Sequence, residues 1–421
     1  MKTQSPATPD RSTSPDTNLK PLAQAIAVVC AGMAANSVYA DSCTTASTVI
    51  TGSVQDVCLL DTGESVSVTS LATLSSIGNV PGVAATGTSV AGSITNNGTI
   101  AGLNLLTNDG ATDIALMTAL GVFIGDTSTL SGGILNNGTI LGQVAGTAAV
   151  TAPLMEITIT ASYGTGIAVE NSGILSGGVT NNSGGVIAGL AEARIYGATS
   201  AMPGAVTSDA YAYARIAYGI YVDTLATLNG GISNHGTIKG HAIADILVAG
   251  ATSSVVANVY SAYGLFINGT YNDGGVGLVN TGTISGIASA TAVVQAATDL
   301  YWVAAGYSSG SYAYGAYFGP NADIAGDITN SGMIEGRVLS SASAYGTGTA
   351  ATMSYATAKA YSAYGLYLKA DVTGEINNSG TIAGEASATI HLENFGTFNN
   401  NPFASASSAC SFNSGDPSDF S

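Results

Sequence analysis

Charged side chains are scarce in this sequence. Only 8% of its 421 residues are charged, whereas about a quarter is usual in a globular protein. Lysine and arginine number 9 against 26 aspartate and glutamate residues, so the formal net charge is −17. A surface of that sign repels a phosphate backbone, which excludes nucleic acid as the expected partner. An acidic, lysine-poor surface is instead typical of extracellular proteins, where it favours solubility.

Histidine is also scarce, and this limits the chemistry open to the chain. Its three histidines are His235, His241 and His391, and the first two lie close together. They suggest no serine–histidine–aspartate set, and they are too few to complete a zinc site. We therefore predict no catalytic residue, no metal and no cofactor, and expect that the chain is not an enzyme. The alternative is a β-helical enzyme that cleaves polysaccharides with paired carboxylates.

Three aspartates occupy one position of a repeated segment described below, namely Asp273, Asp323 and Asp371. A turn residue that recurs because its turn recurs explains them. A weak Ca²⁺ ladder along this column is the alternative that the sequence leaves open.

The sequence has four cysteines. Cys43 and Cys58 lie fifteen residues apart, Cys30 lies in an apolar run near the N-terminus, and Cys410 lies near the other end. In an oxidising compartment we expect Cys43 and Cys58 to form a disulfide. Closing so short a loop stabilises a fold by about 3 kcal/mol. Two unrelated thiols are the alternative, and Cys410 is left over in either case.

The apolar run near the N-terminus, residues 21–35, is too short to cross a bilayer. Lys20 precedes it, and Val38-Tyr39-Ala40 supplies the small residues of a cleavage site. This order is typical of a secretory signal peptide. We assign residues 1–40 to an extended signal peptide, and we expect a secreted protein.

A motif with the pattern strand, turn, strand recurs through the body of the sequence. Its first copy is Ile94-Thr95-Asn96-Asn97-Gly98-Thr99-Ile100. With the first asparagine as reference, the later copies follow at steps of 40, 45, 53, 46, 50 and 48 residues. The seven motif asparagines are Asn96, Asn136, Asn181, Asn234, Asn280, Asn330 and Asn378.

The spacing within each copy is that of strands. Apolar and special positions are separated by even numbers, which indicates strands with one buried face. A fixed unit whose repeat length varies is typical of a solenoid. We predict an all-β fold, a right-handed parallel β-helix, the hand being that of parallel crossover connections. Residues 89–390 form its seven repeats, residues 41–88 an N-terminal cap that contains the disulfide, and residues 391–421 an irregular tail.

Each repeat contains a second alternating element, for example Tyr218-Gly219-Ile220-Tyr221-Val222. With two sets of strands in every 40 to 53 residues, we expect about two coils per repeat. The motif asparagines are predicted to stack in a buried ladder, because a lone buried amide costs about 1–3 kcal/mol when it is unpaired.

The second element also predicts a stripe of aromatic side chains. If Ile220 and Val222 point inward, Tyr221 points outward. With two coils per repeat, rings at this position would lie about 10 Å apart along the solenoid. The stripe is either a binding platform or a set of strand-favouring rings that cover one another. It consists of Phe123, Tyr221, Phe266, Tyr317 and Tyr367.

The signal peptide, the uncharged Gly/Thr/Asn-rich body and repeats such as Gly230-Gly231-Ile232-Ser233-Asn234-His235-Gly236 together resemble the passenger region of bacterial autotransporters. The resemblance covers residues 20 to 390. It implies a right-handed parallel β-helix that the outer-membrane translocation machinery exports to the surface of a Gram-negative bacterium. Such passengers are often adhesins, so a host or glycan surface is the expected partner, and self-association is an alternative.

Autotransporter passengers are followed by a C-terminal β-barrel that anchors them. No barrel-like series of strands follows residue 390 in this sequence, and we expect the chain to lack its own translocator. Without one, a periplasmic location is the alternative to the cell surface. The competing functions are a surface adhesin, a polysaccharide-active β-helix and a structural coat component.

Overall fold

The computed structural model describes residues 43, 47–86, 90–108, 113–150, 156–198, 208–249, 252–272, 274–296, 303–346, 353–394, 401–406 and 412–414. All of these belong to one compact unit, Val38–Ser421. The regular elements within it are strands, and no helix occurs among the described residues. The signal peptide expected over residues 1–40 lies outside them.

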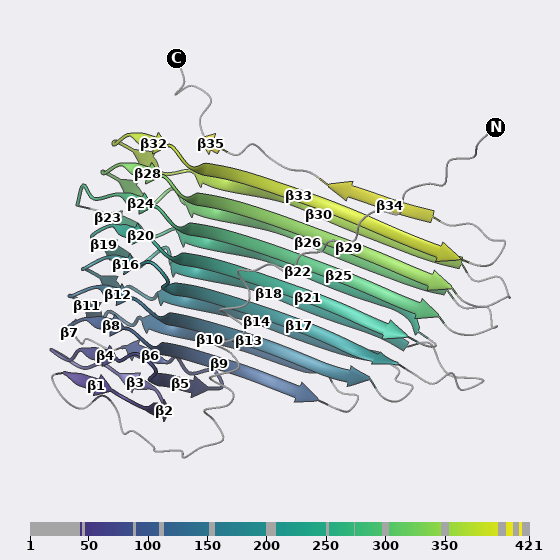
Figure 1. Cartoon of the computed structure of the whole chain (residues 1–421), viewed down its shortest axis with the longest axis horizontal. Coiled ribbons are helices and arrows are strands. Elements are labelled where there is room, and N and C mark those ends of the chain that lie inside the picture. The colour runs from purple at the N-terminus through teal and green to yellow at the C-terminus, as the bar shows by residue number, and fades with distance from the viewer. Residues whose placement is uncertain are drawn as a thin grey trace, which may run out of the picture. The chain divides into compact units, whose positions relative to one another are not determined.

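The strands form four parallel sheets, A to D (Figure 1). Sheets A and D consist of short strands. Sheet A contains β1 (Thr48–Ile50), β4 (Val66–Val68), β8 (Ile94–Asn96), β12 (Ile134–Asn136), β16 (Val179–Asn181), β20 (Ile232–Asn234), β24 (Leu278–Asn280), β28 (Ile328–Asn330) and β32 (Ile376–Asn378). Sheet D contains β7 (Val90–Ala91), β11 (Thr129–Leu130), β15 (Ile174–Leu175), β19 (Thr227–Asn229), β23 (Thr270–Asn272), β27 (Asp323–Ile324) and β31 (Asp371–Val372).

Sheets B and C contain the long strands. Sheet B contains β2 (Ser53–Gln55), β5 (Thr73–Ile77), β9 (Thr99–Asn108), β13 (Thr139–Val150), β17 (Val186–Ala198), β21 (Thr237–Ala249), β25 (Thr283–Ala296), β29 (Met333–Gly346) and β33 (Thr381–Asn394). Sheet C contains β3 (Cys58–Leu59), β6 (Val83–Ala85), β10 (Ile114–Ile124), β14 (Glu156–Val169), β18 (Ser208–Val222), β22 (Thr252–Ile267), β26 (Val303–Phe318), β30 (Met353–Leu368), β34 (Asn401–Ala406) and β35 (Phe412–Ser414).

The predicted parallel β-helix is confirmed, but the predicted coil count is wrong. Each repeat makes one coil, in which the chain passes through sheets D, A, B and C in turn. Asn96 therefore pairs in register with Asn136 of the next strand of sheet A. The Ala/Tyr-rich segments, which suggested a second coil, are instead the far halves of the long strands of sheets B and C.

Differences in repeat length are absorbed in two places. The strands of sheets B and C lengthen along the chain, from 10 residues in β9 and 11 in β10 to 14 in β33 and 16 in β30. The repeat of Asn181 has a longer turn between sheets A and B, where Gly184 has a φ of 84°. Val186 then pairs in register with Thr139 and Thr237, so the neighbouring coils are undisturbed.

Each coil encloses two separate cores. The first lies between sheets A and D and the adjoining parts of B and C, and it contains Ile220, Ile232 and Ile238. The second lies between the far halves of sheets B and C and is rich in alanine, with Ala212 and Ala242 as examples. Both cores are buried, so successive residues of these long strands alternate between buried and outward positions.

A column of glycines in sheet B separates the two cores. A side chain on Gly240 would collide with the carbonyl oxygens of Ala217 and Tyr263 in sheet C. The main chains of the two sheets therefore touch at this level, which we call the waist. The glycines of the waist are Gly102, Gly142, Gly189, Gly240, Gly286 and Gly336.

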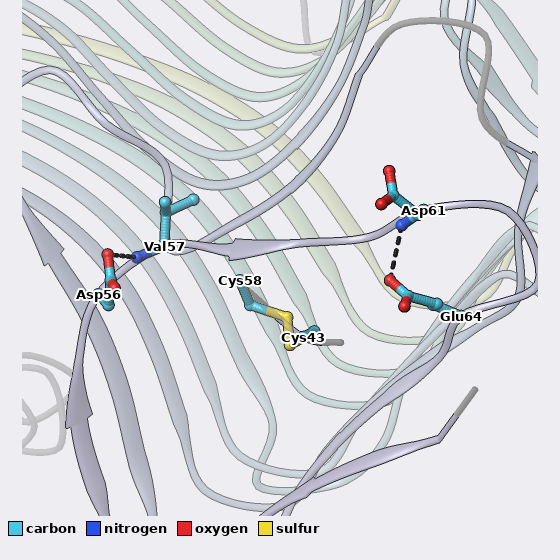
Figure 2. Close-up of a disulfide and its surroundings, with 6 residues drawn as sticks. All are labelled: Cys43, Asp56, Val57, Cys58, Asp61 and Glu64. Carbon is cyan, nitrogen blue, oxygen red and sulfur yellow. Dashed lines mark hydrogen bonds between the residues drawn. A yellow bond between two sulfur atoms is a disulfide. The ribbon is translucent and has the colours of Figure 1, made fainter. Parts of the chain in front are cut away.

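The N-terminal region continues the same sheets. Strands β1 to β3 and β4 to β6 make two short coils that precede the first motif asparagine. A disulfide joins Cys43 to Cys58 at the start of this region (Figure 2), and both cysteines are buried in the first core. Beside it the backbone N–H of Asp61 donates to the Glu64 carboxylate, 2.8 Å away. At the other end β34 and β35 pair with β30, so parts of residues 391–421 are strands rather than irregular tail.

Candidate functional site

The motif asparagines form a continuous ladder in sheet A. Each side-chain amide donates to the Oδ1 of the next asparagine, at distances between 2.7 and 2.8 Å. The same nitrogen donates to the sheet B strand of the next coil, as from Asn234 to the carbonyl of Thr283, the first residue of β25. Asn96 to Asn330 are buried, whereas Asn378 at the end of the ladder is exposed. The ladder is therefore a structural feature that links successive coils inside the solenoid.

The aromatic residues gather on the outer face of sheet C. The predicted stripe lies there in register, with Tyr221, Phe266, Tyr317 and Tyr367 on successive strands. Their ring centroids are 5.5, 4.8 and 5.5 Å apart, and the rings are stacked. The expected spacing of about 10 Å is wrong because the coils that bear these rings are adjacent. Phe123 is separated from Tyr221 by Ala168, which occupies the same position on β14.

A second column of rings runs beside the first. It consists of Tyr218, Tyr263, Tyr314 and Tyr364, which are also in register and stacked, 4.9 to 5.2 Å apart. Between the columns the rings meet edge to face, as in the 4.9 Å contact of Tyr263 with Phe266. The stripe is therefore a double column of half-buried rings, where the sequence predicted a single exposed one.

Two residues three apart share this face because the strand bends at the waist. Inward side chains along β18 alternate up to Ala214, but the next ones are Ala217 and Ile220. Each step of three residues between inward side chains leaves two outward residues in succession instead of one. Tyr218 and Tyr221 therefore both point outward, and their ring centroids are 4.6 Å apart. The signal in the sequence is the recurring pattern Tyr-Gly-x-Tyr/Phe, whose first tyrosine was not included in the predicted stripe.

Mutual coverage makes the second column, which contains Tyr218, largely apolar. Tyr218 is only 8% exposed. Burial raises the pKa of Tyr263 to about 12, and it also raises the pKa values of Tyr218 and Tyr314. The phenol groups thus remain protonated at neutral pH and present hydroxyl donors at the edge of an apolar stack.

Exposed tyrosines extend this face over the second core. Tyr260, Tyr307, Tyr312 and Tyr361 are each between 40 and 49% exposed, and all belong to sheet C. The outer face of sheet C therefore combines a rigid double column of rings with more accessible rings beside it. Such a face suits contact with flat, weakly polar partners such as sugar rings.

The double column is interrupted at β14, and a cavity of about 330 Å³ lies at the interruption. Its wall contains two threonines, a tyrosine, a leucine and a glutamate. It also contains the first ring of each column, on β18. The lining residues are Thr118, Leu120, Tyr163, Thr165, Glu170, Tyr218 and Tyr221. We call this cavity the ring-gap pocket.

The structure does not bring the remaining candidate residues together among the residues that it describes. His235 lies in the turn after β20 and contacts Ser233 and Thr281 at the surface, whereas His241 is buried on β21. Asp323 and Asp371 pair in register in sheet D, and Asp273 lies outside the described residues. No group of three or more potential metal ligands occurs within the described ranges.

Comparison with known proteins gives no relative. No protein-family profile matches the chain, and no curated protein or solved structure is significantly similar to it. Within the described ranges, no helix has the length and apolar character needed to cross a bilayer. The function must therefore be inferred from the surface itself.

Proposed function

We propose that this protein is a secreted or surface-displayed β-helical passenger that binds host or glycan surfaces through the outer face of sheet C. The double column of rings carries the proposal, because it spans the four successive strands β18, β22, β26 and β30 at one unbroken register. Each ring alone offers a modest contact. Repetition on a rigid support multiplies such contacts through high effective concentration.

The resemblance to autotransporter passengers supports the same proposal from the sequence side. It supplies the expected route, export through the outer membrane of a Gram-negative bacterium. The buried Asn ladder and the waist make the support stiff, since each coil is fixed to the next by side-chain and main-chain hydrogen bonds. A stiff support keeps the rings aligned when they meet an extended partner.

Adhesion of purified protein to immobilised glycans and to host-type cells tests the proposal. The test variant replaces the exposed rings Tyr260, Tyr312 and Tyr361 together by Ser, which leaves the stacked columns and both cores intact. The matched control is Tyr196→Ser, because Tyr196 is a 36% exposed tyrosine on sheet B. We expect the triple variant to lose only part of its adhesion, because the double column remains, and the control to keep all of it.

Replacing Tyr221, Phe266, Tyr317 and Tyr367 together by Ser removes the first column of rings itself, and we expect this variant to lose most adhesion. Circular dichroism and the unfolding midpoint establish whether this variant is folded. Undiminished adhesion by the folded quadruple variant and by the triple variant would show that the binding surface is not on sheet C.

A further inference from the structure

The ring-gap pocket exists because one coil lacks both rings of the double column. In register, Leu120, Thr165 and Tyr218 occupy one position on successive strands. Leu120 and Tyr218 are two coils apart, about 9.6 Å at the usual strand spacing. The short side chain of Thr165 between them leaves the space that a ring occupies in the later coils.

The wall of the pocket includes a carboxyl group. Glu170 lines it, and burial raises the pKa of this carboxyl group, with smaller contributions from the charges of Asp223 and Asp126. Asp223 is tied to the same place, since the hydroxyl of Tyr221 donates to its Oδ1 over 3.1 Å. The ion pairs found among the described residues involve Arg194 and Arg337 of sheet B. A partly buried carboxylate with acidic neighbours favours a cationic ligand.

The backbone holds Glu170 in place. Its N–H donates to the carbonyl of Ile124, and its carbonyl accepts from the N–H of Gly173, which closes a tight turn. Asn171 and Ser172 within this turn have φ values of 49° and 66°, in the left-handed region. The same turn recurs one coil earlier, where Asp126 and Thr127 have φ values of 52° and 69°, so a repeated turn of the solenoid fixes the position of Glu170.

The chain itself shows a cation on the same ring column. Lys369 occupies the position on β30's coil that Glu170 occupies on β14's coil, immediately after the last residue of the strand. Its Nζ lies over the ring of Tyr367, 5.6 Å from the centroid. The faces of these rings therefore accept a positive charge at one end of the column. At the end of the column beside β14, the residue at this position is Glu170, an acid instead of a lysine.

We propose that the ring-gap pocket binds an alkylammonium group, with the cation placed between the faces of Tyr218 and Tyr221 and the carboxylate of Glu170. Tyrosine faces attract a cation through their quadrupole, and a carboxylate compensates its charge. Thr118 and Thr165 add hydroxyl groups for the polar remainder of the ligand. The inference is separate from adhesion, because a solenoid could bind surfaces with the exposed tyrosines while this pocket stays empty.

Calorimetric titration of the whole secreted chain tests the proposal with choline as the probe. The matched ligand is 3,3-dimethylbutan-1-ol, which has the same shape without the charge. We expect choline to bind at least about tenfold more tightly, the scale expected of one charge-assisted contact. Two further probes distinguish the sources of the ammonium group. Tighter binding of n-butylammonium, which mimics a lysine side chain, would indicate a protein source, and tighter binding of choline a small molecule. Tighter binding of glucosamine than of glucose would indicate an amino sugar.

Two variants locate the binding. Glu170→Gln keeps the shape and removes the charge, and it should weaken choline binding about tenfold or more. Thr165→Tyr restores the ring found in later coils and should abolish binding by filling the pocket. Asp323→Asn, an exposed acid on sheet D, is the control that should change nothing.

Equal binding of choline and its neutral analogue, or unchanged choline binding by Glu170→Gln, would overturn the proposal. Tighter binding of glucose than of glucosamine would also overturn it and would indicate a neutral sugar subsite. Glu170→Gln decides the question by itself if Thr165→Tyr fails to fold.

Discussion

The side-chain amide of Asn234 donates to the Oδ1 of Asn280 over 2.7 Å, although 46 residues separate them in the chain. Both residues are fully buried. Asn234 also accepts from Asn181 and donates to the carbonyl of Thr283. One short side chain thus satisfies polar groups in three successive coils, which makes it sensitive to substitution.

Asn234→Leu should lower the free energy of unfolding by roughly 3 kcal/mol, because at least two buried polar groups lose partners at about 1–3 kcal/mol each. The unfolding midpoint in urea measures this. Asn378→Leu is the matched control, since Asn378 is exposed at the end of the ladder, where it accepts from Asn330 and donates weakly to the carbonyl of Gly380. Equal midpoints for the two variants would contradict a buried ladder that stabilises the fold.

This ladder was predictable from the sequence because one asparagine recurs at one offset in every repeat. The number of coils was not predictable in the same way. Alternation shows that residues such as Ile238 and Ala242 face inward, but it does not show that they enter two different cores of one coil. The column of glycines at the waist is the feature that separates these cores, and its role depends on contact between sheets B and C.

The candidate site was predictable only in part for a related reason. The position of Tyr221 follows from its buried neighbours Ile220 and Val222. Tyr218 lies three residues earlier, where strict alternation places it on the other face, and the bend at the waist reverses this. The ring-gap pocket left a trace in the sequence, because residues 163–169 match the second element imperfectly. The sequence does not show that this mismatch creates a pocket, because that depends on Thr165 lying between Leu120 and Tyr218 in register.

Gly240→Ala should destabilise the protein by about 3 kcal/mol, because the added methyl group meets main-chain oxygens that cannot move without separating sheets B and C. Gly52→Ala is the control, because a Cβ at exposed Gly52 meets nothing within 4 Å. Thermal unfolding of both variants distinguishes a specific collision from a general cost of replacing glycine. A midpoint for Gly240→Ala as high as that of Gly52→Ala would mean that the sheets are not in contact at the waist.

Removing the disulfide should weaken the first coils. Cys43→Ser with Cys58→Ser should cost about 3 kcal/mol in their local stability, the value for a loop closed over 15 residues. Since repeat proteins unfold as neighbouring units, hydrogen exchange should increase in β1 to β6 and change little in β26. Reductant should reproduce this pattern in the parent and have no effect on the double variant. Uniform exchange changes along the solenoid would contradict the local effect.

The last prediction concerns Glu170 and follows from the sign of its pKa shift. Burial, and then the charges of Asp223 and Asp126, raise its pKa above the ordinary value of 4.5. Between the unfolded and the raised folded pKa, the folded chain binds the proton more tightly. Stability therefore rises as the pH falls through the folded pKa, and the gain is complete below 4.5. Above the folded pKa the ionised carboxylate destabilises the fold.

Glu170→Gln should accordingly raise the urea midpoint at neutral pH, and its advantage should disappear as the pH falls below 4.5. Thr270→Ala removes no charge and should differ from the parent by a constant amount. Choline should raise the midpoint of the parent at neutral pH, since a ligand of the folded state stabilises it, but not that of Glu170→Gln. A difference between Glu170→Gln and the parent that is independent of pH would show that this carboxylate carries no burial cost, and a cation would then have no charge to compensate in the pocket.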